Sequence, residues 1–172
     1  MRTTVQPSAG ERDLRRDDFP ASWEETLRHA LVAGLIVSAF TVAAAALRGR
    51  ADSGSAVAPI NATSHVVYGP RAGDVDEVDL EHTLPGLAIN TGASLFWATI
   101  YERLFGRADA GRALLGGAAV AALAYLVDYH LVPKRLTPGW EERVSDRSLA
   151  AIFGAMAVSL PIRRLLEELI ER

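Results

Sequence analysis

The sequence contains no cysteine, and this absence excludes disulfides, thiolate nucleophiles and cysteine-ligated metal centres. It contains one lysine, Lys134, and a net charge of −3, so it lacks the basic excess that binding to nucleic acid requires. A phosphate-binding glycine loop, a Gly-x-Ser-x-Gly elbow and a His-Glu-x-x-His motif are also missing. The sequence therefore predicts no catalytic residue, no metal-ligand set, no cofactor and no nucleic-acid partner, and it favours a non-enzymatic role.

Charge is scarce in four long blocks of the chain, and these blocks predict membrane-spanning helices. Residues 30–47 are all uncharged, and this length suffices for a helix across a hydrocarbon core of about 30 Å. Ser22 and Glu25 form a capping-box pattern before this block. We expect one domain over residues 22–172 after a disordered polar tail over residues 1–21. The expected spans are about 28–48, 83–103, 112–132 and 147–163.

Two further segments predict helices that do not span. "APINATSHVVYG" predicts a re-entrant or interfacial helix over about 58–68, which is too short to cross a bilayer. Residues 163–172 predict an amphipathic helix whose Arg163 and Arg164 reach the lipid headgroups. The expected fold class is therefore all-α, a transmembrane helical bundle of about four spanning helices plus the short re-entrant or interfacial helix.

Basic residues are divided unequally between the two sides that four spans would create. Eleven arginines fall on the side of the termini, and seven basic residues fall on the other side. The positive-inside rule then places both termini in the cytoplasm. Because the arginine- and alanine-rich composition is typical of GC-rich bacterial genomes, we expect a multi-pass protein of the bacterial inner membrane.

Asp128 is the most informative polar residue in a predicted span. A carboxylate at the middle of a bilayer costs about 2.5 to 3.5 kcal/mol, so we expect it to face protein or water. Gly117 and Ala124 precede it at helical spacing, which places Asp128 on a face of small residues that contacts another helix. Two interpretations stay open. Asp128 is either a proton or cation site with Tyr129 nearby, or an interface residue that pairs with Arg135 or water.

A second polar pattern runs along the second predicted span. Asn90, Ser94, Trp97 and Tyr101 recur at spacings of four, three and four residues, which places them on one helical face. This face either lines a polar cavity or supplies hydrogen bonds to neighbouring helices. Together with Asp128, it would define the polar path of a small transporter or channel.

The predicted loops hold the remaining site candidates. His65, His82 and His130 fall on one side of the membrane and would be the ligands of a membrane haem or metal protein, although no pair has the spacing of a known motif. The other loop candidates are Asn61, Arg135 and Glu141.

The stretch "LVDYHLVPKRLTPGWEER" is interpreted as a helix end at the membrane surface. Tyr125, Tyr129 and Trp140 are expected in the aromatic belt, and Pro133 is expected to end the helix. Thr137 and the proline after it are expected to open a short surface helix.

The blocks "APINATSHVVYG", "LFWATIYERLFG" and "DYHLVPKRLTPGWE", in this order, resemble those of uncharacterised small multi-pass bacterial inner-membrane proteins. The resemblance covers most of residues 25–165 and implies an integral membrane protein without an assigned activity. The leading prediction is a non-enzymatic component of the envelope or of a membrane complex. Its expected partners are the lipid bilayer and either a second copy of the chain or another membrane protein.

Overall fold

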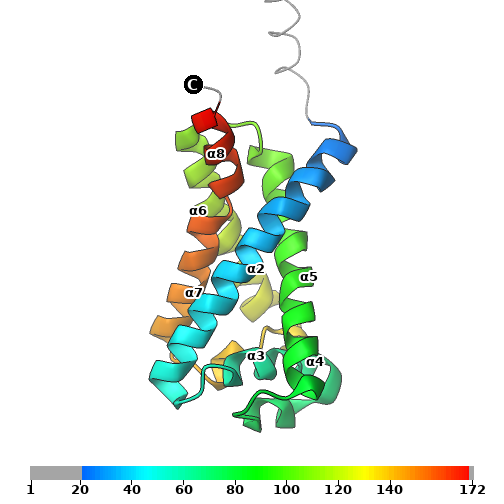
Figure 1. The fold of residues 1–172 in the computed structure, drawn as a ribbon, viewed down its shortest axis with the longest axis vertical. Helices are drawn as coiled ribbons and strands as arrows, with labels where there is room; N and C mark the ends of the chain where they lie inside the picture. The colour runs from blue at the N-terminus through cyan, green and yellow to red at the C-terminus, as the bar shows by residue number, and fades with distance from the viewer. Residues whose placement is uncertain (1–20, 171–172) are drawn as a thin grey trace, which may run out of the picture.

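The computed structural model describes residues 21–170, and within this range it is helical and contains no strand. Almost all of the predicted tail, and the last two residues of the predicted amphipathic helix, lie outside the described range. The long helices run side by side, alternately up and down (Figure 1). They are α2 (Trp23–Ser53), α5 (Leu80–Phe105), α6 (Ala110–Leu126) and α7 (Asp146–Ser159). The prediction of an all-α helical bundle is confirmed.

The shorter helices lie at the two ends of this bundle (Figure 1). One end, the loop end, carries α3 (Ala58–Thr63), α4 (His65–Tyr68) and the 3-10 turns Pro70–Asp74, Lys134–Leu136 and Trp140–Glu142. The other end, the terminal end, carries α8 (Ile162–Ile170) and the start of α2. Two short helices thus occupy the segment in which one interfacial helix was predicted.

Three helical segments are long and apolar enough to cross a membrane, namely Trp23–Ser53, Ala110–Leu131 and Asp146–Ile170. The helix α5 has 26 residues and packs along α2, but it is not among these three. Polar residues such as His82 and Asn90 lower its mean hydropathy. The structure therefore supports three of the four predicted spans on length and composition.

The helix starts follow local capping chemistry. The Ser22 hydroxyl accepts a hydrogen bond from the Glu25 backbone N–H at 3.1 Å, so the predicted cap of α2 is confirmed. The Asp79 carboxylate caps α5 and accepts from the Glu81 backbone N–H at 2.9 Å. Pro85 lies in the second turn of α5, because this helix begins at Leu80, before the predicted span.

Glycines allow two close contacts between helices. A Cβ atom on Gly117 would lie 2.4 Å from the Ala157 carbonyl oxygen of α7, and one on Gly86 would lie 2.0 Å from the Ile60 carbonyl oxygen of α3. Ala124 is also fully buried. The predicted contact of the small-residue face of α6 with another helix is confirmed.

Two residues that were predicted at the membrane surface are buried instead. Trp140 is 7% exposed, because Gly139 adopts φ 77° and the turn that follows directs the indole into the core. This turn opens at Trp140 and not at the predicted Thr137. Arg163 is 6% exposed and forms an ion pair inside the bundle, so it does not reach the headgroups.

Candidate functional site

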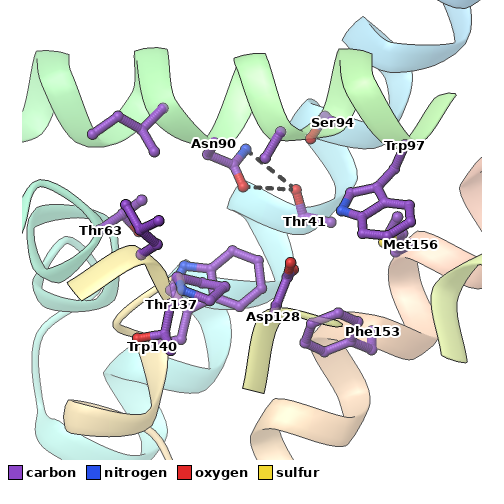
Figure 2. A pocket seen from close by; sticks show the side chains of 14 residues that line it. Thr41, Thr63, Asn90, Ser94, Trp97, Asp128, Thr137, Trp140, Phe153 and Met156 are labelled. Carbon is purple, nitrogen blue, oxygen red and sulfur yellow. Dashed lines mark hydrogen bonds between the residues drawn. The ribbon is translucent and has the colours of Figure 1, made fainter. Parts of the chain in front are cut away.

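A cavity of about 80 Å³ lies inside the bundle, between the long helices and the loop end (Figure 2). Its polar lining comes from Thr41 of α2, Asn90 and Ser94 of α5, and Asp128 (Figure 2). Its volume suffices for a few water molecules, and its polar groups could hydrogen-bond them. The cavity therefore joins two sets of predicted site residues that are about 40 positions apart in the chain.

Asp128 lies in a π-helical turn, Val127–Leu131, that continues α6. The Val132 backbone N–H donates to the Val127 carbonyl oxygen at 3.0 Å and closes this turn. The Asp128 side chain points into the cavity (Figure 2). Within residues 21–170 no group forms a hydrogen bond or an ion pair with its carboxylate, and the predicted partner Arg135 is exposed. Single π turns inside helices are often found at functional sites.

Asn90 has both roles that were predicted for its helical face, because it bonds to a neighbouring helix and lines a polar cavity. Its amide Nδ2 donates to Ser38 Oγ at 3.1 Å and to Thr41 Oγ1 at 3.3 Å, and both acceptors belong to α2. The same side chain lines the cavity (Figure 2). Asn90 therefore joins two helices and is fixed in orientation where it faces the cavity.

The rest of the face divides into cavity and core. Ser94 and Trp97 line the cavity, and neither the Ser94 hydroxyl nor the Trp97 indole N–H has a hydrogen bond to another described residue. Tyr101 lies outside the cavity, is fully buried, and donates from its hydroxyl to the Ala113 carbonyl oxygen at 3.2 Å. Tyr129 is also outside the cavity, with its ring centroid 5.9 Å from that of Phe153.

Several cavity residues were not predicted from the sequence. Thr41 and Thr63 are hydroxyl residues within apolar segments, and this is the same signal that drew attention to Ser94. Trp140 and Phe153 complete an aromatic wall, but no local pattern predicts that either one would face Asp128. Their position depends on how the loop end folds back onto the bundle.

Asn61 is a structural residue of the loop end. It is fully buried, and its Nδ2 donates to the carbonyl oxygens of Val75 and Glu77, both at 2.9 Å. Its Oδ1 accepts from Thr83 Oγ1 at 2.7 Å. These bonds hold the acidic segment after the Pro70–Asp74 turn against α3 and α5.

The three histidines that were considered as metal or haem ligands do not come together. His65 Nδ1 lies 2.8 Å from the Ala62 carbonyl oxygen, and its Nε2 lies 3.2 Å from that of Lys134, so both ring nitrogens face backbone oxygens. His82 bonds to Asp79, and His130 is exposed beside Tyr125.

The two other loop candidates are Arg135 and Glu141, and both follow the third long helix in the chain. Arg135 is exposed in the 3-10 turn Lys134–Leu136. Glu141 accepts a hydrogen bond from Thr137 Oγ1 at 2.8 Å, next to the cavity. It therefore orders the segment that covers the cavity, although it does not line it.

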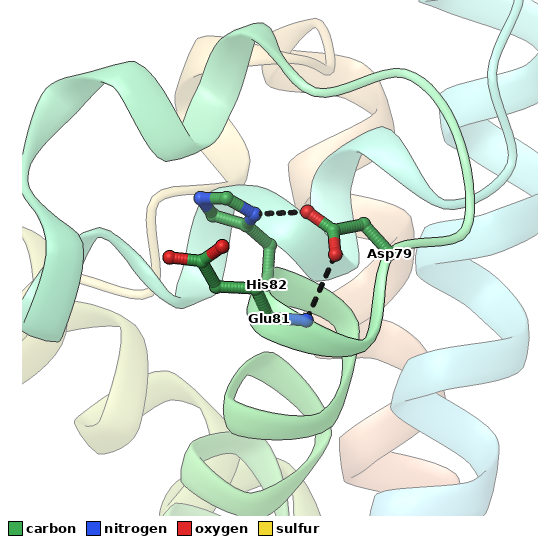
Figure 3. Close-up of side chains that lie close together, drawn as sticks. All are labelled: Asp79, Glu81 and His82. Atoms are coloured by element: carbon green, nitrogen blue, oxygen red, sulfur yellow. Dashed lines mark hydrogen bonds and ion pairs between the residues drawn. The ribbon is translucent and has the colours of Figure 1, made fainter.

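Within the described part of the chain, one group of three side chains has suitable types and spacing for a metal ion. Its ligand atoms, from Asp79, Glu81 and His82, lie within 4.8 Å of one another (Figure 3). Both Asp79 oxygens are already used, one 2.5 Å from His82 Nδ1 and the other by the Glu81 backbone N–H. The His82 bond, followed by the Glu81 bond, lowers the pKa of Asp79. This group is a helix cap, and the positive end of α5 opposes a cation there.

Comparison with protein-family models, with curated proteins and with solved structures finds no match for this chain.

Proposed function

We propose that the chain is a four-span protein of the bacterial inner membrane that binds a cation at Asp128 and forms part of a path for it. In this proposal α5 is the fourth span, because it lies alongside helices that are apolar enough to cross. Both termini face the cytoplasm, in keeping with the excess of arginine at the terminal end.

The observation that carries this function is the half-buried Asp128 carboxylate, which lines a cavity of the bundle and has no hydrogen-bond or ion-pair partner among residues 21–170. An ionised acid away from bulk water is unfavourable unless it is paired, protonated or hydrated. A bound proton or larger cation would supply the missing charge, and acids inside membrane proteins commonly mark such paths. The fixed Asn90 amide would orient water or the ligand beside it, as would the Ser94 hydroxyl, which has no hydrogen bond to another described residue.

Topology can be tested with reporter fusions in the three connections between long helices. Fusions at Gly54, Gly106 and Gly139 should report outside, inside and outside in turn. A cytoplasmic signal at Gly54 would reverse the proposed orientation. The same signal at Gly54 and Gly106 would show that α5 does not cross.

Cation movement can be tested in liposomes that contain the purified protein. We expect the wild-type chain to pass protons or a monovalent cation faster than Asp128→Asn does. Asp74→Asn is the matched control, because Asp74 is an exposed acid at the same loop end but away from the cavity. Equal fluxes through wild type and Asp128→Asn would contradict the proposal.

One further observation favours a second function, the non-enzymatic membrane component that associates with a copy of itself. An open groove of about 510 Å³ lies between α6 and α7 and is lined largely by small residues such as Ala122, Ala150 and Gly154. Small residues at a membrane surface allow close approach of another helix.

This association is easily tested because the chain has no cysteine of its own. Gly154→Cys should form a disulfide-linked dimer in membranes, since no atom lies within 4 Å of a Cβ placed there. Leu35→Cys, on an exposed position of α2, should not cross-link. A Gly154→Cys protein that stays monomeric under oxidation would exclude this interface.

A further inference from the structure

The cavity around Asp128 has a second chemical property, an aromatic wall. Trp97 of α5, Trp140 of the loop end and Phe153 of α7 all line it (Figure 2). The ring centroids of Trp140 and Phe153 are 6.0 Å apart in an edge arrangement. All three side chains are buried, so the rings are held in place by the surrounding core.

Three separate segments therefore bring aromatic rings to the cavity of Asp128, a carboxylate with no hydrogen-bond or ion-pair partner among the described residues. From this juxtaposition we infer that the cavity selects a small organic ammonium ion, such as a methylated amine, over inorganic cations. The inference rests on the proposed cation site at Asp128 and specifies its ligand.

Inorganic cations match this lining poorly. Ca²⁺ takes six to eight oxygen ligands, and Mg²⁺ requires near-octahedral oxygens. The cavity offers one carboxylate and a few neutral oxygens, and most of its lining is apolar. An anion would meet the Asp128 charge directly, so a negatively charged ligand is also disfavoured.

An alkylammonium ion uses both parts of the lining. The Asp128 carboxylate balances its charge, while its methyl groups, which carry much of that charge, lie against aromatic faces. Recognition of quaternary ammonium groups by aromatic side chains works in this way. A cavity of about 80 Å³ is far below the range for drug-sized ligands, so only a small ammonium ion is expected to enter.

Two parts of the chain line the loop-end side of the cavity. They are Thr63 of α3 and the segment from Leu136 to Trp140. His65 holds this segment, because its ring nitrogens lie against the carbonyl oxygens of Ala62 and Lys134. Gly139 packs on the same ring, where a Cβ would lie 2.6 Å from His65 Nδ1. These contacts fix the backbone before Trp140 and hold its ring at the cavity.

Tryptophan fluorescence gives a direct binding assay. Trp23 is 62% exposed and lies at the other end of the bundle, so Trp23→Phe leaves only the two cavity tryptophans as reporters. In this background, tetramethylammonium chloride should produce a saturable change in emission. Sodium chloride, potassium chloride and the uncharged analogue tert-butanol, at matched concentration, should not.

Variants then assign the response to the two parts of the site. Asp128→Asn should weaken tetramethylammonium binding at least tenfold, and Asp74→Asn should leave it unchanged. Trp97→Leu, followed by calorimetry, should weaken it severalfold while keeping the carboxylate. If Asp128→Asn does not fold, as judged by circular dichroism and gel filtration, Trp97→Leu alone decides whether the aromatic wall contributes.

The outcomes separate this inference from the function on which it rests. Saturable binding of tetramethylammonium that depends on Asp128 and Trp97 supports both. An Asp128-dependent response to Na⁺ or K⁺ that equals or exceeds the response to tetramethylammonium overturns the ammonium selectivity and keeps the cation site. Tetramethylammonium binding that is unaffected by Trp97→Leu also overturns the inference. No Asp128-dependent response to any of these cations, together with no Asp128-dependent proton flux, overturns both.

Discussion

The Arg163 guanidinium and the Glu102 carboxylate form a bidentate ion pair inside the terminal end of the bundle. Nε lies 2.7 Å from Oε1, and Nη2 lies 2.6 Å from Oε2. Arg163 also donates to the Gly106 carbonyl oxygen at 3.0 Å and lies 2.6 Å from the Glu167 carboxylate. Both partners of the pair are almost fully buried. The pair therefore joins α8 to the last turn of α5.

Removing one partner of this pair should be strongly destabilising. Glu102→Gln removes the buried counter-charge of Arg163 and leaves it only the more exposed Glu167, so we expect the free energy of unfolding to fall by about 3 kcal/mol. The double variant Glu102→Leu with Arg163→Met should recover most of this loss, because it leaves no unpaired charge among the buried side chains. Thermal and denaturant unfolding in detergent measure both. A double variant as unstable as Glu102→Gln would show that the charges are not the cause.

Two glycines of α5 provide a matched test of helix packing. Gly86→Ala places a Cβ 2.0 Å from the Ile60 carbonyl oxygen, so it should cost about 1 to 3 kcal/mol and loosen α3. Gly92→Ala meets no atom within 4 Å and should stabilise the helix by about 0.5 to 1 kcal/mol. Unfolding midpoints of the two variants should move in opposite directions. Shifts of the same sign would contradict the close approach of α3 and α5.

Asp128→Asn should not destabilise the protein, although it should weaken cation binding. The carboxylate has no partner among the described residues, and a neutral amide of similar shape is less costly inside the bundle. We expect the free energy of unfolding to stay the same or rise by about 1 kcal/mol. The same measurement on Asn90→Ala should show a loss, because Asn90 bonds to α2. A large loss of stability in Asp128→Asn would instead assign Asp128 a structural role.

The cap of α5 should make the stability of the loop end depend on pH in the acid range. The His82 bond, and then the Glu81 backbone bond, hold the pKa of Asp79 below its ordinary value of 3.8. The unfolded chain therefore binds this proton more readily than the folded chain does. The stabilisation is complete above pH 3.8 and is lost as the pH falls through the lower folded value.

A carboxyl titration by NMR checks this assignment. His82→Ala removes the largest cause and should raise the pKa of Asp79 toward its ordinary value. Glu81→Gln is the control, because the Glu81 bond comes from its backbone N–H and survives the change. An Asp79 pKa that His82→Ala leaves in place would mean that the histidine bond is unimportant in solution.

Much of the bundle follows from the linear pattern of the chain. The uncharged run after Ser22 predicts α2, and the spacing from Gly117 to Ala124 predicts which face of α6 contacts a neighbour. These features depend on residues within a few turns of one another, which is the range over which helical periodicity acts. The spacing of Asn90, Ser94 and Trp97 likewise predicts a common face, and this face lies at the cavity.

The remaining features depend on contacts between distant segments. Tryptophan is a residue type typical of the aromatic belt at a membrane surface, but the positive φ of Gly139 turns the Trp140 side chain into the core. The sequence around Arg163 predicts a side chain at the lipid headgroups, but α5 places Glu102 beside it and the two form a buried ion pair. Whether α5 spans the membrane also depends on such contacts. Its polar side chain Asn90 bonds to α2, so this side chain would not face lipid if α5 spans. Sequence hydropathy cannot separate a polar residue that faces lipid from one that faces another helix.

The π turn at Val127–Leu131 is equivalent to one extra residue in a regular helix. Each residue of an α-helix advances the side-chain direction by about 100°, so deleting one residue after Asp128 in this turn would redirect the segment that leads to Trp140 relative to the acid and leave the bundle before it intact. A related chain could therefore keep every helix, and even keep the aspartate, yet lack the ligand site through a single-residue gap. When homologues are compared, an alignment gap between 127 and 131 would mark the loss of this site as clearly as a substitution of Asp128.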